Sequence, residues 1–332
     1  MEDRKKDHIE LALKSQTLKE TIDSRFDYEP LFEAHPSRSP EPFEFLGKKQ
    51  CHPIWVSSMT GGTKMAGTIN RNLARACKEF GMGMGLGSCR MIMDDDTYFE
   101  DFNVRPIMGD DLPLYANLGI AQIEEFLTSN TLHRIPTLLD RLEADGLVVH
   151  VNPIQEWCQP EGDHFGNAPI DTLKRLLDQA EFRIIVKEVG QGMGPASLKA
   201  LLKLPLEAIE FAAYGGTNFS LVELERSSLA MKESYEPLTS AGHTAEEMLD
   251  MVNSMVAGEP DILCKQLIIS GGIKTFLDGY YLVKKSSLRA IYGQAGGFLA
   301  HAMEDYETLR EYVDYQVKGW QLAEAYLTPK YD

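Results

Sequence analysis

The sequence lacks the features that mark secreted, zinc-bound or membrane proteins. Its five cysteines are odd in number and scattered, with no C-x-x-C pair, so we expect reduced thiols rather than disulfides or a zinc site. No apolar run approaches the roughly 18 residues of a membrane span, and the acidic residues near the start do not fit a signal peptide. These absences predict a soluble, cytoplasmic protein with no membrane partner.

Positive charge is also scarce. The chain has 33 Lys and Arg against 50 Asp and Glu, for a formal net charge of −17. Nucleic acids and anionic membranes both need a basic protein face, so neither is expected as a partner. The densest basic cluster is RKKDHI, residues 4–9. A solvated terminal run is the usual explanation of such a cluster, and an anion-binding arm that acts together with Arg90 is the alternative.

Eight short apolar runs, bounded by turn residues, recur along the 332 residues. Most are nearly continuous in apolar residues, which is typical of parallel strands covered on both faces. Segments with a helical pattern separate them. This alternation predicts an α/β fold, a TIM (β/α)8 barrel, with an open doubly wound sheet as the competitor. The runs begin at Ile54, Gly81, Leu112, Gly146, Arg183, Ala208, Lys265 and Ser287.

The barrel is expected to be a single domain. Residues 1–50 are predicted to form an N-terminal arm that contributes basic residues, and residues 51–332 to form the barrel itself. The longest insertion, residues 220–262, lies between the sixth and seventh strands.

Glycine pairs follow three consecutive strands, at 215–216, 271–272 and 296–297. Glycine lets the backbone approach a ligand and present N–H groups to an anion, and the last loops of TIM barrels commonly bind phosphate in this way. One pair alone would more often be an ordinary turn. Three pairs at successive strand ends favour a phosphate-bearing cofactor.

A lysine lies near the end of the fifth strand, in IIVKEVG. Lys187 is costly inside an apolar strand unless it is paired or faces a ligand. Strand alternation sends Lys187 and Glu188 to opposite faces, which weakens the explanation that they form a salt bridge. The alternative is that Lys187 balances the negative charge of an electron-rich ring.

The fourth strand ends in HVNPIQE, which places four polar side chains within seven residues. Alternation points His150 and Asn152 to the same side. Pro153 then ends the strand, and the turn brings Gln155 and Glu156 over the open end of the barrel that His150 and Asn152 face. A polar strand cap explains any one of these residues, but a ligand site explains all four.

Eight motifs together are similar to one family. The chain resembles type 2 isopentenyl diphosphate isomerases, which are flavin-dependent TIM barrels. The motifs lie in family order between residues 4 and 274, and HVNPIQE together with RKKDHI is the most specific combination. They are RKKDHI, SSMTGG, GSCR, ANLG, HVNPIQE, KEVGQGM, GGTN and SGGIK. One departure is Phe219, where the family often has Trp.

The resemblance implies roles for individual residues. Glu156 would bind Mg²⁺, and Gln155, Lys187 and His150 would be catalytic. The FMN ligands would be Ser58, Met59, Thr60, Gly61, Ser88, Asn117, Lys187 and Thr217, with Gly271, Gly272, Ala295 and Gly296 around its phosphate. The substrate ligands would be Arg4, Lys5, His8, Ser88, Arg90, His150, Asn152 and Gln155.

The resemblance also implies a reaction and its cofactors. The family interconverts isopentenyl diphosphate and dimethylallyl diphosphate by moving protons, with reduced FMN, Mg²⁺ and NADPH as reductant. Its members are commonly homotetramers or homo-octamers. Two alternatives remain. One is another FMN-dependent TIM-barrel oxidoreductase of the hydroxy-acid type, and the other is a barrel that binds flavin or a diphosphate without catalysis.

Overall fold

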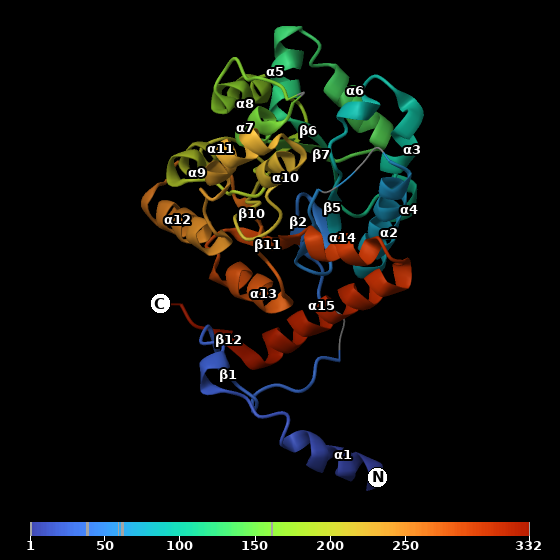
Figure 1. The fold of residues 1–332 in the computed structure, drawn as a ribbon, viewed down its shortest axis with the longest axis vertical. Helices are drawn as coiled ribbons and strands as arrows, with labels where there is room; N and C mark the ends of the chain where they lie inside the picture. The colour runs from blue at the N-terminus through green and yellow to red at the C-terminus, as the bar shows by residue number, and fades with distance from the viewer. Residues whose placement is uncertain (1, 38–39, 59, 61–62, 161, 332) are drawn as a thin grey trace.

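The eight apolar runs form a closed barrel of parallel strands, in the order β10-β11-β4-β5-β6-β7-β8-β9. Helices surround the strands (Figure 1). The computed structural model describes residues 2–37, 40–58, 60, 63–160 and 162–331. The predicted TIM barrel is therefore confirmed, and each predicted run contains one strand. The strands are β4 (Ile54–Val56), β5 (Gly83–Gly85), β6 (Leu114–Gly119), β7 (Gly146–His150), β8 (Arg183–Lys187), β9 (Ala208–Glu210), β10 (Gln266–Ser270) and β11 (Arg289–Gln294).

Helices form the outer layer of the barrel, because one face of each is apolar and packs on the strands. Their ends follow local sequence signals. The Thr63 side chain caps the start of α2 by accepting the Ala66 N–H, and Gly81 ends α2 in the left-handed conformation. The outer helices are α2 (Lys64–Phe80), α5 (Ile120–Thr128), α6 (Arg134–Leu142), α8 (Pro169–Leu177), α9 (Pro195–Leu202), α12 (Ala245–Gly258), α13 (Phe276–Lys285) and α15 (Tyr306–Tyr326).

Shorter helices lie in the loops that follow the strands. The predicted insertion between the sixth and seventh strands contains α10, α11 and the outer helix α12, and α10 packs on α7. The loop helices are α3 (Phe99–Phe102), α4 (Arg105–Met108), α7 (Pro153–Cys158), α10 (Phe219–Arg226), α11 (Leu229–Thr239) and α14 (Gly296–Ala302). Three short 3-10 helices span Lys19–Thr21, Arg90–Ile92 and Asp96–Tyr98.

The interior of the barrel is closed at its amino-terminal end by an apolar floor. A hairpin of β2 (Phe43–Phe45) and β3 (Lys48–Gln50) inserts Phe45 and Leu46, both fully buried, beneath the strands. This hairpin belongs to the segment that the sequence analysis assigned to the arm. The strand residues that it meets are Trp55, Tyr115, Val148, Ile185, Ala208, Ile268 and Ile291.

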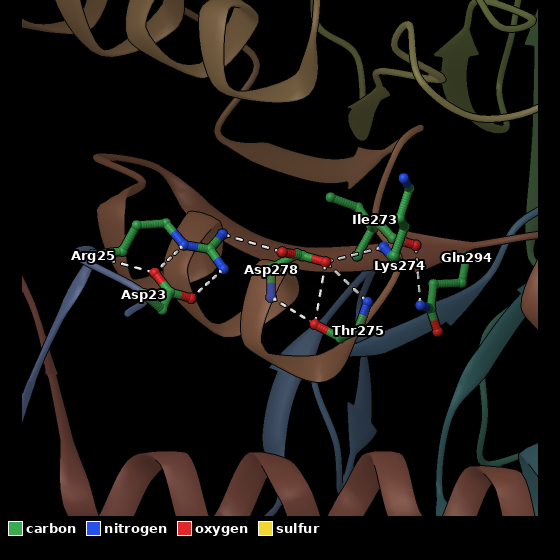
Figure 2. Close-up of polar contacts among 7 residues, drawn as sticks. All are labelled: Asp23, Arg25, Ile273, Lys274, Thr275, Asp278 and Gln294. Atoms are coloured by element: carbon green, nitrogen blue, oxygen red, sulfur yellow. Dashed lines mark hydrogen bonds and ion pairs between the residues drawn. The ribbon is translucent and has the colours of Figure 1, made fainter. Parts of the chain in front are cut away.

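The rest of the arm runs outside the barrel. Its strand β1 (Phe26–Tyr28) pairs antiparallel with β12 (Leu327–Pro329) near the other end of the chain. Arg25 next to this strand binds Asp278 on α13 at 3.1 Å (Figure 2). The first helix, α1 (Glu2–Ala12), stands apart from the barrel (Figure 1). Within the described residues no helix combines the length and apolar character that crossing a membrane requires.

We predict that Phe45→Ala lowers the free energy of unfolding by about 3–5 kcal/mol, because it leaves a cavity in the closed floor. Urea unfolding followed by circular dichroism measures this change. The control is Glu44→Ala, which alters an exposed side chain of the same hairpin. Equal stability of the two variants would show that the hairpin does not seal the barrel.

Candidate active site

A polar layer crosses the barrel directly above the apolar floor. Side chains alternate along a strand, so the residue two positions beyond each floor residue faces the interior again. On β7, β8 and β9 these residues are His150, Lys187 and Glu210, and they are paired in register across the three strands. The same step gives Ser57, Asn117, Ser270 and Gly293 from four other strand residues of the floor, and Gly85 follows Gly83 in the same way on β5.

A cavity of about 400 Å³ opens over one side of this layer. Ser57, Lys187, Glu210 and Ser270 line it from the layer, and the loops after β9, β10 and β11 supply its walls with the three glycine pairs. Seven of the predicted FMN ligands therefore line one cavity. They are Ser58, Lys187, Thr217, Gly271, Gly272, Ala295 and Gly296.

The wall after β10 depends on glycine at two positions. Gly271 has φ +90°, and a Cβ there would lie 2.1 Å from the Ala213 nitrogen. Gly272 has φ +72° and faces the loop that holds Gly215 and Gly216. A side chain at either position would be strained, so these turns keep backbone atoms exposed to the cavity.

Lys187 is 6% exposed at the floor of this cavity. Its ammonium donates to the main-chain carbonyl of Glu188 at 2.8 Å. The Glu188 carboxylate instead accepts the N–H groups of the loop residues 190, 191 and 192, in agreement with the predicted opposite directions of the two side chains. Burial lowers the pKa of Lys187, and the negative charges of Glu210 and Glu188 oppose that shift.

His150 lies beside Lys187 in the polar layer. Its Nδ1 is 2.7 Å from Oδ1 of Asn117, which is buried on the neighbouring strand. With this oxygen as acceptor, the ring proton is on Nδ1 and Nε2 is an acceptor. Burial, together with the nearby Lys187 charge, lowers the pKa of His150 to about 3. The imidazole is therefore neutral near pH 7.

The polar residues after β7 bind one another rather than continuing the strand. The strand ends at His150, and the buried Asn152 precedes helix α7. Its amide donates to Gln155 Oε1 at 3.1 Å and to Glu156 Oε1 at 2.9 Å. Strand alternation therefore does not place Asn152, although the turn at Pro153 does bring Gln155 and Glu156 to it.

Asp163 links Arg90 to this cluster. The exposed Arg90 forms an ion pair of 2.7 Å with Asp163 Oδ2, which also accepts the Gln122 amide. The Asp163 N–H donates to Glu156 Oε2 at 2.9 Å. Both oxygens of the buried Glu156 are thus occupied. Within the described residues no three His, Cys, Asp or Glu gather as a metal site.

A larger cavity, of about 550 Å³, lies behind β8 and is lined by Asn152 and Gln155. Much of its lining is aliphatic, with Ile154, Ile170, Leu173 and Leu201 among the wall residues. Val189 lines both cavities. The cavity lined by two of the predicted substrate residues, Asn152 and Gln155, therefore adjoins the cavity of the predicted FMN residues at the segment that follows β8.

Several predicted ligands lie away from these cavities. Arg4, Lys5 and His8 are exposed on α1, which stands apart from the barrel (Figure 1). Ser88 is exposed beside Arg90 in a separate surface hollow, and the main-chain carbonyl of Thr60 accepts from Asn70 on α2. Met59 and Gly61 lie outside the described residues. The roles of these residues remain predictions.

The sequence analysis did not assign Lys274 or Gln294, both of which line the smaller cavity. Gln294 donates to the Ile273 carbonyl at 3.1 Å, and Asp278 accepts the Lys274 N–H (Figure 2). Glu210 and Ser270 were also missed. Counting two residues on from the inward apolar residue of β9 would have identified Glu210 as an inward side chain. Lys274 could have been identified because it belongs to the SGGIK motif.

Several known proteins with a similar sequence share a name. The isopentenyl-diphosphate delta-isomerase of Rickettsia felis is 33% identical over 94% of this chain and 88% of its own. The enzyme of Mycolicibacterium gilvum with the same name is 31% identical over 84% of this chain and 79% of its own. The chain belongs to the isopentenyl-diphosphate delta-isomerase family. This confirms the resemblance seen in the motifs, and the barrel agrees with the type 2 enzymes. No family model matches the chain.

Two solved structures illustrate the similarity of fold. A flavocytochrome b2 mutant with pyruvate bound has a TM-score of 0.62 and 11% identity, over 91% of this chain and 72% of that one. A mandelate oxidase mutant with an FMN adduct has a TM-score of 0.57 and 12% identity, over 93% and 88%. At these identities the likeness is one of fold.

We predict that His150 remains neutral from about pH 5 to 8, because burial and the Lys187 charge lower its pKa to about 3. Nitrogen NMR of ¹⁵N-histidine-labelled protein measures this, with His150→Asn to identify its signals. Titration of the His150 ring near pH 6.5, the ordinary value, would contradict the burial seen here.

Proposed function

We propose that the protein is an isomerase that interconverts isopentenyl diphosphate and dimethylallyl diphosphate with reduced FMN and Mg²⁺. The observation that carries the proposal is the buried Lys187 at the floor of a cavity walled by three glycine turns. Relatives named for this activity, at up to 33% identity, support the same substrate.

FMN fits the smaller cavity. Buried oxygens of Ser57, Ser58 and Glu210 have no hydrogen-bond partner within the described residues, and a ring with polar edges would supply partners for them. The glycine turns leave backbone room for a phosphate, as proposed for Gly271, Gly272, Ala295 and Gly296. A reduced flavin, when bound, supplies an electron-rich ring whose nitrogens can give and take a proton.

The protein's task is to bind and orient both partners. Lys187 would place a positive charge where it stabilises negative charge on the ring. The neutral His150 and its partner Asn117 lie beside Lys187 in the polar layer. Ser58 and Thr217 would donate to the cofactor from the cavity wall, and the more distant Ser88 stays a predicted ligand.

The diphosphate needs positive charge in an acidic protein. Arg90 and Asn152 would hold it near Glu156, whose carboxylate would hold Mg²⁺, and the ion would supply further positive charge for the diphosphate. Arg4, Lys5 and His8 remain predicted ligands, and the arm must fold over a barrel mouth for them to act. The aliphatic cavity beside Gln155 suits a hydrocarbon, in keeping with a place for Gln155 at the isoprenoid end.

The hydroxy-acid oxidoreductases are the main rival, since they share the fold. Their chemistry requires a histidine that acts as a base and an arginine that binds the substrate carboxylate, both on the late strands. Among the described residues that line the smaller cavity there is neither histidine nor arginine, which favours the isomerase. A non-catalytic barrel would bind FMN but show no turnover, so the assay below separates it. NADPH as reductant, cytoplasmic location and a homotetramer or homo-octamer are parts of the same proposal.

We predict that anaerobic protein with FMN, NADPH and Mg²⁺ interconverts the two C5 diphosphates, and that Gln155→Asn and Glu156→Gln each lower turnover at least tenfold, about 1.4 kcal/mol. Gln155→Asn draws the amide back from the substrate by one methylene group, and Glu156→Gln removes the carboxylate assigned to the metal. Product formation measured by mass spectrometry tests this.

The matched controls for this assay are Gln179→Asn and Glu225→Gln, which make the same changes at exposed positions, in the turn after α8 and on α10. Both should keep parental turnover. If the two site variants also kept it, the assigned roles of Gln155 and Glu156 would be wrong.

We predict that chelation of divalent ions stops turnover and that Mg²⁺ restores it. In Glu156→Gln, the Mg²⁺ concentration for half-maximal rate should rise at least tenfold, since the variant loses the only carboxylate assigned to the ion. Rates measured over a Mg²⁺ series give this value. An unchanged Mg²⁺ requirement would place the ion elsewhere.

A further inference from the structure

Glu210 is a carboxylate inside the barrel to which the proposed function assigns no part. It is fully buried on β9, and it lines the smaller cavity beside Lys187. The two residues are register partners on adjacent parallel strands, and both face the interior. A buried carboxylate is rare unless it is paired with a positive group or hydrogen-bonded.

Hydrogen bonding fixes one oxygen of Glu210 and leaves the other open. The Ser270 hydroxyl accepts the Ala212 N–H at 2.9 Å, so its own proton is directed to Glu210 Oε1 at 3.2 Å. Within the described residues no group makes a hydrogen bond of good geometry to Glu210 Oε2, although the Ser57 and Trp55 side chains lie near the carboxylate and favour its charged form. The carboxylate is therefore held in place without being saturated, and its charge can act on the neighbouring strand.

The charged groups around Lys187 are few. His150 on β7 is neutral near pH 7 and offers no negative charge. Glu188 is next along the chain, and its carboxylate accepts hydrogen bonds from the N–H groups of three loop residues. Glu210 on β9 is the first of the negative groups that raise the pKa of Lys187 against the effect of burial. Burial raises the pKa of Glu210, and the Lys187 charge opposes that shift, so each of the two residues favours the charged form of the other. Glu210 is thus the counter-charge within the polar layer.

This counter-charge matters because an isolated ammonium in a buried site loses its proton. A neutral amine at the cavity floor could not balance the negative charge of a ring above it. We propose that Glu210 is a positioning residue that keeps Lys187 protonated and in place at the cavity floor. The identity of the ring rests on the proposed function, whereas the state of Lys187 does not.

Carbon NMR of the full-length protein with ¹³C-labelled lysine tests the proposal without any activity measurement. Lys187→Met identifies the Lys187 signal. We expect Lys187 to be protonated at pH 7 in the parent. In Glu210→Gln we expect Lys187 to titrate at a lower pH, with the proton concentration at its midpoint at least tenfold higher than in the parent. A neutral Lys187 in the parent would overturn the proposal, and so would an unchanged titration in the folded Glu210→Gln variant.

Two further variants separate charge from packing. Glu210→Asp keeps the carboxylate and should keep Lys187 protonated at pH 7. Ser270→Ala removes a hydrogen bond but no charge, so it should shift the Lys187 titration less than Glu210→Gln does. A larger shift in Ser270→Ala than in Glu210→Gln would overturn the role of the charge. If Glu210→Gln does not fold, the proposal is tested by the Lys187 titrations of the parent and of Glu210→Asp, and a neutral Lys187 at pH 7 in either protein would overturn it.

Flavin binding separates this proposal from the proposed function. We expect FMN titrated into the parent to bind with a change in its absorbance, and reduced FMN to bind Glu210→Gln at least tenfold more weakly than the parent. No FMN binding by the parent would contradict the proposed function and leave the Lys187 titration to decide on Glu210. Equal affinity of reduced FMN for both proteins would overturn the role of Glu210 toward the ring.

Discussion

Strand alternation in a closed barrel is the constraint on which the rest of the molecule depends. Each strand has one inward residue in the apolar floor and another two positions further on. The floor is sealed by large side chains and by Phe45 of the hairpin below. A ligand cannot reach the polar layer from the sealed end. The polar groups are therefore accessible from the carboxyl end of the strands, where the active sites of TIM barrels lie.

The composition of that layer divides the mouth into two halves. Ser57, Gly85, Ser270 and Gly293 are small, and they leave room over one side of the barrel. On the other side, His150 and Lys187 stand next to Glu210. Three ionisable groups in adjacent strands influence one another strongly at low dielectric. Burial lowers the pKa of both His150 and Lys187; the Lys187 charge adds to the shift of His150, whereas the Glu210 charge opposes the shift of Lys187. A neutral imidazole follows from this arrangement, and a protonated Lys187 beside it is the state that we propose.

Much of the fold could be predicted from the sequence, because apolar runs and turn glycines report local structure. Every predicted run contains a strand, and the glycine pairs meet at one cavity since the ends of parallel strands share one edge. Asn152 was harder, because the strand stops at His150 and a helix begins where alternation was assumed to continue. Glu210 was missed because it lies in a run, AIEFAAY, that otherwise reads as apolar core. Asp163 lies in a loop, and only the folded chain brings it to Arg90.

A crystal structure of the protein reduced with FMN and grown without oxygen in the presence of dimethylallyl diphosphate tests the central claim most directly. A flavin ring should lie over the polar layer, with the Lys187 ammonium at about 3 Å from a ring oxygen or nitrogen. The diphosphate should lie beside Asn152 and Glu156. A flavin bound elsewhere, or a diphosphate remote from these residues, would contradict the arrangement on which the proposed function depends.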